Sequence, residues 1–464
     1  MNKSFHLAII TKKEKNATIT TMSKELESHL DLLDQKIRQG DIKFVQNELD
    51  GLELERVPNR YAARIASLAR RVSRGSLGVD ILYPIVRPRD SKKAKATGED
   101  IAEYAALLTY LGSWREALGL LKKLNPEEFP QVWLYQAFGF FAHWDYKGAI
   151  EPLQKYIASK NLSDYERLVG QLNLAAAWVN EKKYDDAREL LQLVIREARK
   201  ESYKTILANA LERSAELSIG LKHWKTAETL LLEAESLISE KNNLYNLFIR
   251  KWMVFLNILS EGYPEHYQIK LKNLRAEAQQ LQHWETVRDC DRFEAVVTQN
   301  KKLLLKVYFG TPHENFRQKL IREFKSTVVI PEFYVWGSEL TEIDSSPLTL
   351  DVSEGVLKTR NSEGMISLTG KTLAKDSLSF RLLSVLSSDF YSPFGDRYLF
   401  AQLYPKENYQ PKSSKEKVCV VVQELRNWFH QNGVPLIITE KNGFFKQEIV
   451  GPLLMKVGLK RNET

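Results

Sequence analysis

The apolar positions between residues 100 and 240 recur in a pattern that appears four times along the chain. In each copy an aromatic residue is followed by alanine three positions later and by leucine seven positions later. Offsets of three and seven fall on one stripe of an α-helix, so these side chains face the same way. Another alanine stands nine positions before each aromatic residue, which places it on a preceding helix. The four stripes are Trp114, Ala117 and Leu121; Tyr146, Ala149 and Leu153; Tyr184, Ala187 and Leu191; Trp224, Ala227 and Leu231, preceded by Ala105, Ala137, Ala175 and Ala215.

Each copy predicts a hairpin of two helices that touch at small residues. Alanine lets two helices approach closely without the loss of helix propensity that glycine brings. Turn residues separate the two helices of each pair, among them Gly112, Asp145 and Lys182. Self-similarity of this kind is the sequence signature of a stacked helical-repeat protein, in which neighbouring units bury one continuous core.

The repeated unit resembles the tetratricopeptide repeat, where a small residue, an aromatic residue, a second small residue and a bulky apolar residue follow in that order. Successive aromatic residues are 32, 38 and 40 residues apart, against about 34 in the ordinary repeat, which predicts longer helices. The resemblance implies an α-solenoid that binds partners along a groove lined by the first helix of each unit. The groove residues expected on this basis are Asn173, Asn180, Asn209 and Arg213.

After about residue 300 the helical stripe stops and short apolar runs follow. Asn442-Gly443 lies between two such runs, and this dipeptide predicts a hairpin because both residues accept positive φ. Strands, three helices and a hairpin make up the order of a winged-helix domain. The expected elements are strands near 328–335, 356–358 and 365–368, a turn at 361–364, helices over 378–386, 398–403 and 415–429, and hairpin strands at 436–439 and 444–448.

This region resembles the OmpR/PhoB-type output domain of bacterial response regulators over about residues 348–450. The run Leu378 to Leu386 is similar to the family's first helix, and Leu425-Arg426 is similar to a pair in its recognition helix. In that family the third helix enters the major groove and the wing reaches the neighbouring minor groove. Carried onto the matching positions, the resemblance implies nucleic-acid contacts from Ser414, Lys415, Lys417, Gln423, Arg426 and Lys441.

The third helix also departs from the family's pattern, which leaves two functions open. Cys419 and Val421 stand where DNA-binding members usually carry polar or basic residues, and Glu424 would repel phosphate. One function is a bacterial transcriptional regulator, with the solenoid as sensor of a ligand or partner and the winged helix as DNA-binding output. The other is a protein scaffold or adaptor that does not bind DNA, in which a degenerate winged helix serves as a docking module.

Together these patterns predict a mostly α-helical chain, with a tetratricopeptide-like α-solenoid followed by a small α+β winged-helix domain. The expected divisions are a flexible N-terminal tail over 1–21, the solenoid over 22–300, a connector with short strands over 301–347, the winged helix over 348–450 and a C-terminal tail over 451–464.

The net charge of +8 is unevenly placed, with basic residues concentrated near the first expected repeats. Arg60 and Arg64 are four positions apart, which puts them on one helix face, and Arg70 and Arg71 continue the basic stretch. Such a patch suits an acidic partner or nucleic acid. The alternative is a solvated face near the end of the solenoid.

No pattern indicates an enzyme, a metal or a cofactor. Cys290 and Cys419 are the only cysteines, so a disulfide framework and a cysteine zinc site are both excluded. No apolar run approaches the roughly 18–20 residues that span a bilayer, and we expect a cytoplasmic protein whose groove binds a protein or peptide. Histidine-tryptophan pairs recur in expected turns, where histidine can cap the carbonyls of the preceding helix; the histidines are His143, His223 and His283.

Overall fold

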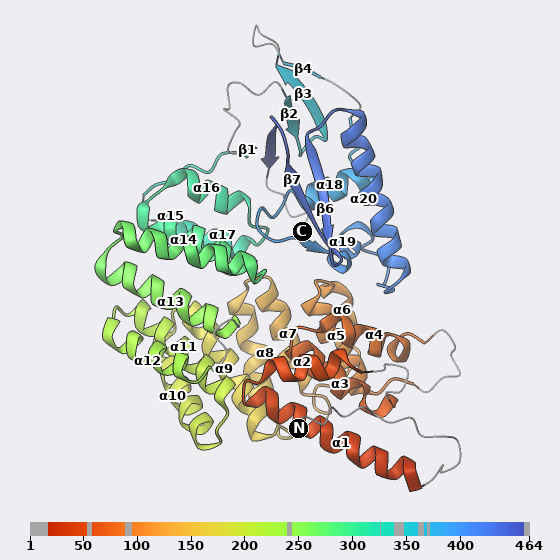
Figure 1. Ribbon diagram of the computed structural model, residues 1–464, viewed down its shortest axis with the longest axis vertical. Coiled ribbons are helices and arrows are strands. Elements are labelled where there is room, and N and C mark those ends of the chain that lie inside the picture. Colours follow the sequence, from red (N-terminus) through yellow and green to blue (C-terminus); the bar gives the residue numbers. More distant parts are fainter. Residues whose placement is uncertain are drawn as a thin grey trace, which may run out of the picture.

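The computed structural model describes residues 17–52, 58–88, 95–238, 244–324, 326–337, 348–360, 366–368 and 372–458. Paired helices stack into a curved array, and a smaller unit of strands and helices lies against it (Figure 1). The chain is mostly helical, with its strands near the C-terminal end, which confirms the predicted fold class.

The array contains a short 3-10 turn at Asn59–Tyr61 and a succession of α-helices. Each aromatic residue of the repeated stripe begins the second helix of its hairpin. The helices are α1 (Ala17–Arg38), α2 (Ile42–Asp50), α3 (Ala62–Arg71), α4 (Gly75–Val86), α5 (Gly98–Tyr110), α6 (Trp114–Leu121), α7 (Gln131–Ala142), α8 (Tyr146–Ala158), α9 (Asp164–Asn180), α10 (Tyr184–Lys200), α11 (Lys204–Gly220), α12 (Trp224–Ser236), α13 (Leu244–Glu261), α14 (Glu265–Gln280), α15 (Trp284–Thr298), α16 (Lys301–Phe309) and α17 (Glu314–Glu323).

Local sequence explains where these helices begin and how they pack. α9 starts with a capping box, in which Ser163 accepts from the Glu166 amide and the Glu166 carboxylate accepts from the Ser163 amide. Lys182 and Lys222 adopt positive φ of 59° and 62° in the turns between paired helices. All eight alanines of the repeated pattern are completely buried, so the close helix contacts predicted from their small size are present.

The array extends beyond both of its predicted limits. α1 begins at Ala17, inside the predicted tail over 1–21, whose first sixteen residues lie outside the described part. Helices occupy residues 301–323, where a connector with strands was predicted. α16 and α17 are short, and their apolar residues did not form a stripe long enough to be recognised. Those buried against the last repeats are Leu304, Val307, Phe309, Phe316 and Leu320.

The C-terminal unit has two small sheets around three helices. A five-stranded sheet has the order β1-β8-β2-β3-β4, in which only the β2–β8 pair is parallel, and a second sheet has the order β5-β7-β6. The elements are β1 (Phe333–Gly337), β2 (Leu348–Asp351), β3 (Val356–Arg360), β4 (Ile366–Leu368), α18 (Leu378–Leu386), β5 (Phe394–Gly395), α19 (Asp396–Leu403), α20 (Ser413–Gln431), β6 (Leu436–Lys441), β7 (Phe444–Ile449) and β8 (Leu454–Gly458).

Most predicted elements of this unit are present, and three short strands, β2, β5 and β8, were missed. The hairpin turn has Asn442 at φ 56° and Gly443 at φ 80°, which confirms the turn with two positive φ angles predicted from this dipeptide. Strand β8 lies where a tail over 451–464 was predicted, because Met455 and Val457 are buried between β1 and β2. The predicted turn at 361–364, residues 338–347 of the connector and residues 459–464 lie outside the described residues.

The close contacts of the array predict the effect of enlarging a buried alanine. Replacing Ala187, which is fully buried at the start of α10, by leucine should destabilise the fold by roughly 1–3 kcal/mol through overpacking. Ala276 on α14 is exposed, so Ala276→Leu is the matched control and should leave stability nearly unchanged. Urea unfolding of the full chain measures both variants, and equal stabilities would contradict the packing role of Ala187.

Candidate functional site

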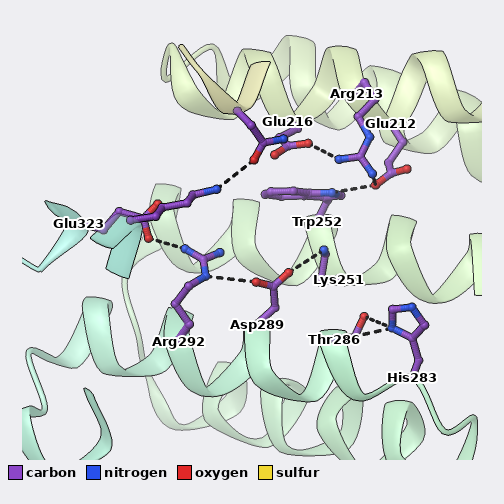
Figure 2. Close-up of polar contacts among 12 residues, drawn as sticks. Glu212, Arg213, Glu216, Lys251, Trp252, His283, Thr286, Asp289, Arg292 and Glu323 are labelled. Carbon is purple, nitrogen blue, oxygen red and sulfur yellow. Dashed lines mark hydrogen bonds and ion pairs between the residues drawn. The ribbon is translucent and has the colours of Figure 1, made fainter. Parts of the chain in front are cut away.

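Charged side chains gather on the inner side of the array, where α11, α13, α15 and α17 lie next to one another (Figure 2). They come from the first helices of successive pairs, which the sequence predicted to line a groove. We call this group the inner polar cluster, and its members are Glu212, Arg213, Glu216, Lys251, Trp252, Asp289, Arg292, Lys319 and Glu323.

Two chains of contacts run through the inner polar cluster. In the first, Arg213 on α11 pairs with Glu216 and Glu212, and the Trp252 indole donates to Glu212 over 2.9 Å. In the second, Asp289 lies between two cations. Its carboxylate accepts from Lys251 Nζ at 3.0 Å and from Arg292 Nε at 3.1 Å. Arg292 then pairs with Glu323 on α17, so this second chain joins α13, α15 and α17.

The electrostatics of the inner polar cluster are balanced within the chain. Burial acts to raise the pKa of Asp289, but Lys251 and Arg292 outweigh it, and the pKa lies well below its usual range. Burial and the neighbouring Arg292 lower the pKa of Lys319, whose ammonium donates to Asn180 over 3.1 Å. Four carboxylates meet four basic side chains here. The arrangement suits a structural lock better than an acid–base catalyst.

Only some of the four predicted groove residues lie in this region, and all four make contacts with other residues of the chain. Asn180 and Arg213 belong to the contacts just described, whereas Asn173 donates to the Val169 carbonyl of its own helix. Asn209 hydrogen-bonds Tyr245. The inner side is not an open groove at this point, because α17 packs into it.

Aromatic contacts hold α17 in this position. Phe316 meets Trp144 edge-on, with ring centroids 4.7 Å apart, and His313 meets His143 with centroids 6.1 Å apart. Burial lowers the pKa of His313 to about 3, so this imidazole stays neutral at physiological pH. The sequence prediction missed this occupant because α17 falls in the segment expected to be a connector.

The predicted basic patch is engaged in ion pairs inside the array. Arg70 pairs with Glu103 at 2.5 Å, and the side chains of the two residues are only 14% and 6% exposed. Arg64 pairs with Asp31 and Arg71 with Asp34, which ties α3 to α1. Arg64, Arg70 and Arg71 are therefore not free cations. The sequence did not reveal these pairs because the acidic partners lie more than thirty residues away. Arg60 lies over the ring of Tyr61 at 4.9 Å.

Three of the six residues predicted to contact nucleic acid have roles inside the C-terminal unit. Ser414 is buried and accepts from the Gln410 amide at 2.8 Å, near the start of α20. Arg426 donates to the Ile438 carbonyl and holds α20 against β6. Lys417 pairs with Glu407 at 2.5 Å. Lys415, Gln423 and Lys441 are the other three, and all are exposed.

The outward face of α20 differs from its expected composition at one position. Val421 is 1% exposed and belongs to the core, whereas Val420 is 58% exposed. Residues two apart on a helix do not share a face, so Cys419 and Val421 point to different sides. We define the outward stripe of α20 by the exposed residues that follow one another at steps of three and four from its N-cap, which are Lys412, Lys415, Glu416, Cys419, Val420, Gln423, Glu424 and Asn427.

The C-terminal unit is joined to the array at two places. At the first, Arg397 at the start of α19 donates to Ser76 at 3.0 Å, and the Tyr409 amide donates to Glu116 at 3.0 Å. A Cβ at Gly112 would lie 2.7 Å from the Tyr398 ring, so glycine permits this approach. At the second, Arg288 of α15 pairs with Asp389 in the segment after α18.

His143 caps the preceding helix as expected, whereas His283 caps the helix that follows it. The Nδ1 atom of His143 lies 2.8 Å from the Gly139 carbonyl of the preceding helix. His283 accepts from the Thr286 amide at the start of α15, and burial lowers the pKa of His283 to about 4. Among the described residues, no group of histidine, cysteine and carboxylate side chains is arranged to hold a metal ion. Nor does that part of the chain contain a helix with the length and apolar character needed to cross a bilayer.

Comparison with known proteins gives little further guidance. No family model matches the chain, and no curated protein matches it. Among solved structures, the chain is similar to aspartyl phosphate phosphatase F from Bacillus subtilis, with 12% sequence identity and a TM-score of 0.36. The similarity covers 68% of this chain and 91% of that chain. At this level of similarity, no functional conclusion passes from one protein to the other.

The inner polar cluster predicts a strong response to loss of one charge. Asp289→Asn leaves Lys251 and Arg292 without their shared carboxylate and should destabilise the fold by about 3 kcal/mol. Asp185 forms an ion pair with Arg188 on the surface and is 92% exposed. Asp185→Asn is therefore the matched control, with an expected change near zero. Denaturant unfolding compares the two, and a small effect at Asp289 would refute its locking role.

Proposed function

We propose that the chain is a bacterial regulator in which the helical array holds a winged-helix unit that binds duplex DNA. The observation that carries the proposal is the outward stripe of α20, an exposed helix face beside a hairpin wing. This function is binding and involves no catalytic step. A regulator that binds DNA in a bacterium would act in the cytoplasm.

The order of side chains along the stripe supports contact with DNA. Lys412 and Lys415 lie at the N-terminal end of α20, where the helix dipole adds to their attraction for phosphate. Gln423 and Asn427 lie further along, and their amides hydrogen-bond each other over 2.9 Å. Asparagine and glutamine read adenine in the major groove, whereas lysine contacts position the helix. Val420, between the two groups, could contact a thymine methyl.

The wing supplies a second point of contact. Lys441 is exposed at the end of β6, next to the Asn442-Gly443 turn. In the winged-helix arrangement the wing reaches the minor groove beside the recognition helix. Among the described residues, Lys412, Lys415 and Lys441 have no carboxylate partner and stay available for phosphate.

A specific observation supports a second candidate, which is docking of a protein on the same stripe. Glu416 and Glu424 are exposed there and would repel phosphate, while Cys419 and Val420 offer apolar surface. In that function the array and the winged-helix unit both bind proteins. Val420→Asp would then abolish capture of the protein partner and leave the fold intact, because Val420 is outside the core.

Salt-dependent binding of a random-sequence duplex to the full chain separates the two candidates. For the DNA-binding function, Lys415→Ala should weaken binding to all sequences and reduce the magnitude of the salt slope by about one. Gln423→Ala should keep the slope and reduce preference for a selected sequence by about 1–3 kcal/mol at one base pair.

Lys147 is an exposed lysine on α8, far from α20 in sequence, so Lys147→Ala is the matched control with an unchanged slope expected. Fluorescence anisotropy across a salt series measures all three variants. Failure of the unmodified chain to bind duplex at low salt would reject the DNA-binding function and leave docking.

A further inference from the structure

A cleft of about 560 Å³ lies between the last repeats and the winged-helix unit. One wall comes from α14, α15 and α16, and the other from β1, β7 and the segment before β5. Basic side chains enter it from both sides, with Arg275, Lys302 and Lys306 on the array and Lys446 on β7. Aromatic residues, among them Trp284, line the rest. This cleft is separate from the inner polar cluster and from the outward stripe of α20.

The carboxylates in the cleft are already engaged. Asp291 pairs with Arg275 at 2.8 Å and with Lys306 at 3.2 Å, and it also accepts from the Tyr391 hydroxyl at 2.9 Å. Glu294 pairs with Arg275 at 2.6 Å. Two negative charges are therefore shared between two positive ones, and this part of the cleft is neutral.

Two further cations remain after those pairs are counted. Within the described ranges, Lys302 and Lys446 have no carboxylate partner. Lys446 is half-buried, with its ammonium 5.2 Å from the centre of the Trp284 ring. Partial burial of the Lys446 ammonium in a cleft that Lys302 also lines favours an anion that neutralises both charges. The excess of two positive charges matches a dianion.

We propose that the cleft binds a small organic phosphate monoester, with its phosphate group held by Lys302 and Lys446. Lysine binds phosphate as a point charge and needs no fixed fork geometry. The cleft volume falls in the range of sites for small organic molecules, so it has room for more than an inorganic ion. The bound ligand touches the array through Lys302 and the wing strand β7 through Lys446, and thereby bridges the two units.

Isothermal titration calorimetry of the full chain tests the proposal with adenosine 5′-monophosphate, glycerol 3-phosphate and inorganic phosphate as probes. At least one ester should bind with one-to-one stoichiometry and more tightly than inorganic phosphate. Lys302→Gln and Lys446→Gln should each weaken that binding about tenfold or more, the scale of a lost hydrogen bond to a charged group. The readout involves no DNA and is independent of the function proposed above.

Lys301 precedes Lys302 on α16, is exposed and does not line the cleft, so Lys301→Gln is the matched control and should bind normally. Thermal unfolding without ligand checks that the three variants remain folded. Three results would overturn the proposal: no saturable binding of either ester, equal or tighter binding of inorganic phosphate, or an affinity that Lys302→Gln and Lys446→Gln leave unchanged.

Discussion

The buried guanidinium of Arg288 decides how the two parts of this chain are held together. Its side chain has no exposure to solvent, and it pairs with Asp389 from the C-terminal unit and with Glu285 from its own helix. A buried charge without a partner is strongly destabilising. Separating the C-terminal unit from the array would remove Asp389 and leave Arg288 without its partner on that unit. The two parts therefore form one structure.

The Asp389 carboxylate also fixes the backbone of the segment that leads to β5. Asp389 accepts from the amides of Tyr391 and Ser392 at 2.8 and 3.0 Å, just before β5 pairs with β7. The other junction fixes α19 against α4 through Arg397, and the segment before α20 against α6 through Tyr409. Figure 1 shows α20 along the right-hand edge of the unit, across the unit from α16. Its outward stripe is left exposed, which is why we place partner binding there.

The sequence predicted features that depend on local periodicity and missed those that depend on distant partners. Buried alanines in the repeats, the bounds of α18 and the Asn442-Gly443 turn all follow from short spacings. The ion pair between Arg70 and Glu103 could not be predicted, because thirty-three residues separate them. For the same reason, the basic residues Arg64 and Arg71 were predicted to form a free binding surface, although each pairs with an aspartate far away in sequence.

Two other differences have separate physical causes. α17 is short, and its helical stripe contains too few apolar residues to be distinguished from a connector. In α20, a run of five apolar residues from Val418 to Val422 leaves the helix phase undetermined, so only the packed structure shows that Val421 is buried and Val420 exposed. Ser414, Lys417 and Arg426, which were predicted to contact nucleic acid, make contacts inside the fold that the sequence did not show.

The central claim, that the outward stripe of α20 contacts duplex DNA, can be tested at a thiol already present on that stripe. Cys419 is exposed, whereas Cys290 is buried and its burial raises the pKa of the thiol to about 12, so a maleimide reacts selectively with Cys419. If α20 enters the major groove, saturating the protein with duplex DNA slows the maleimide modification of Cys419 several-fold. An unchanged rate while the duplex is bound would contradict DNA contact by this face.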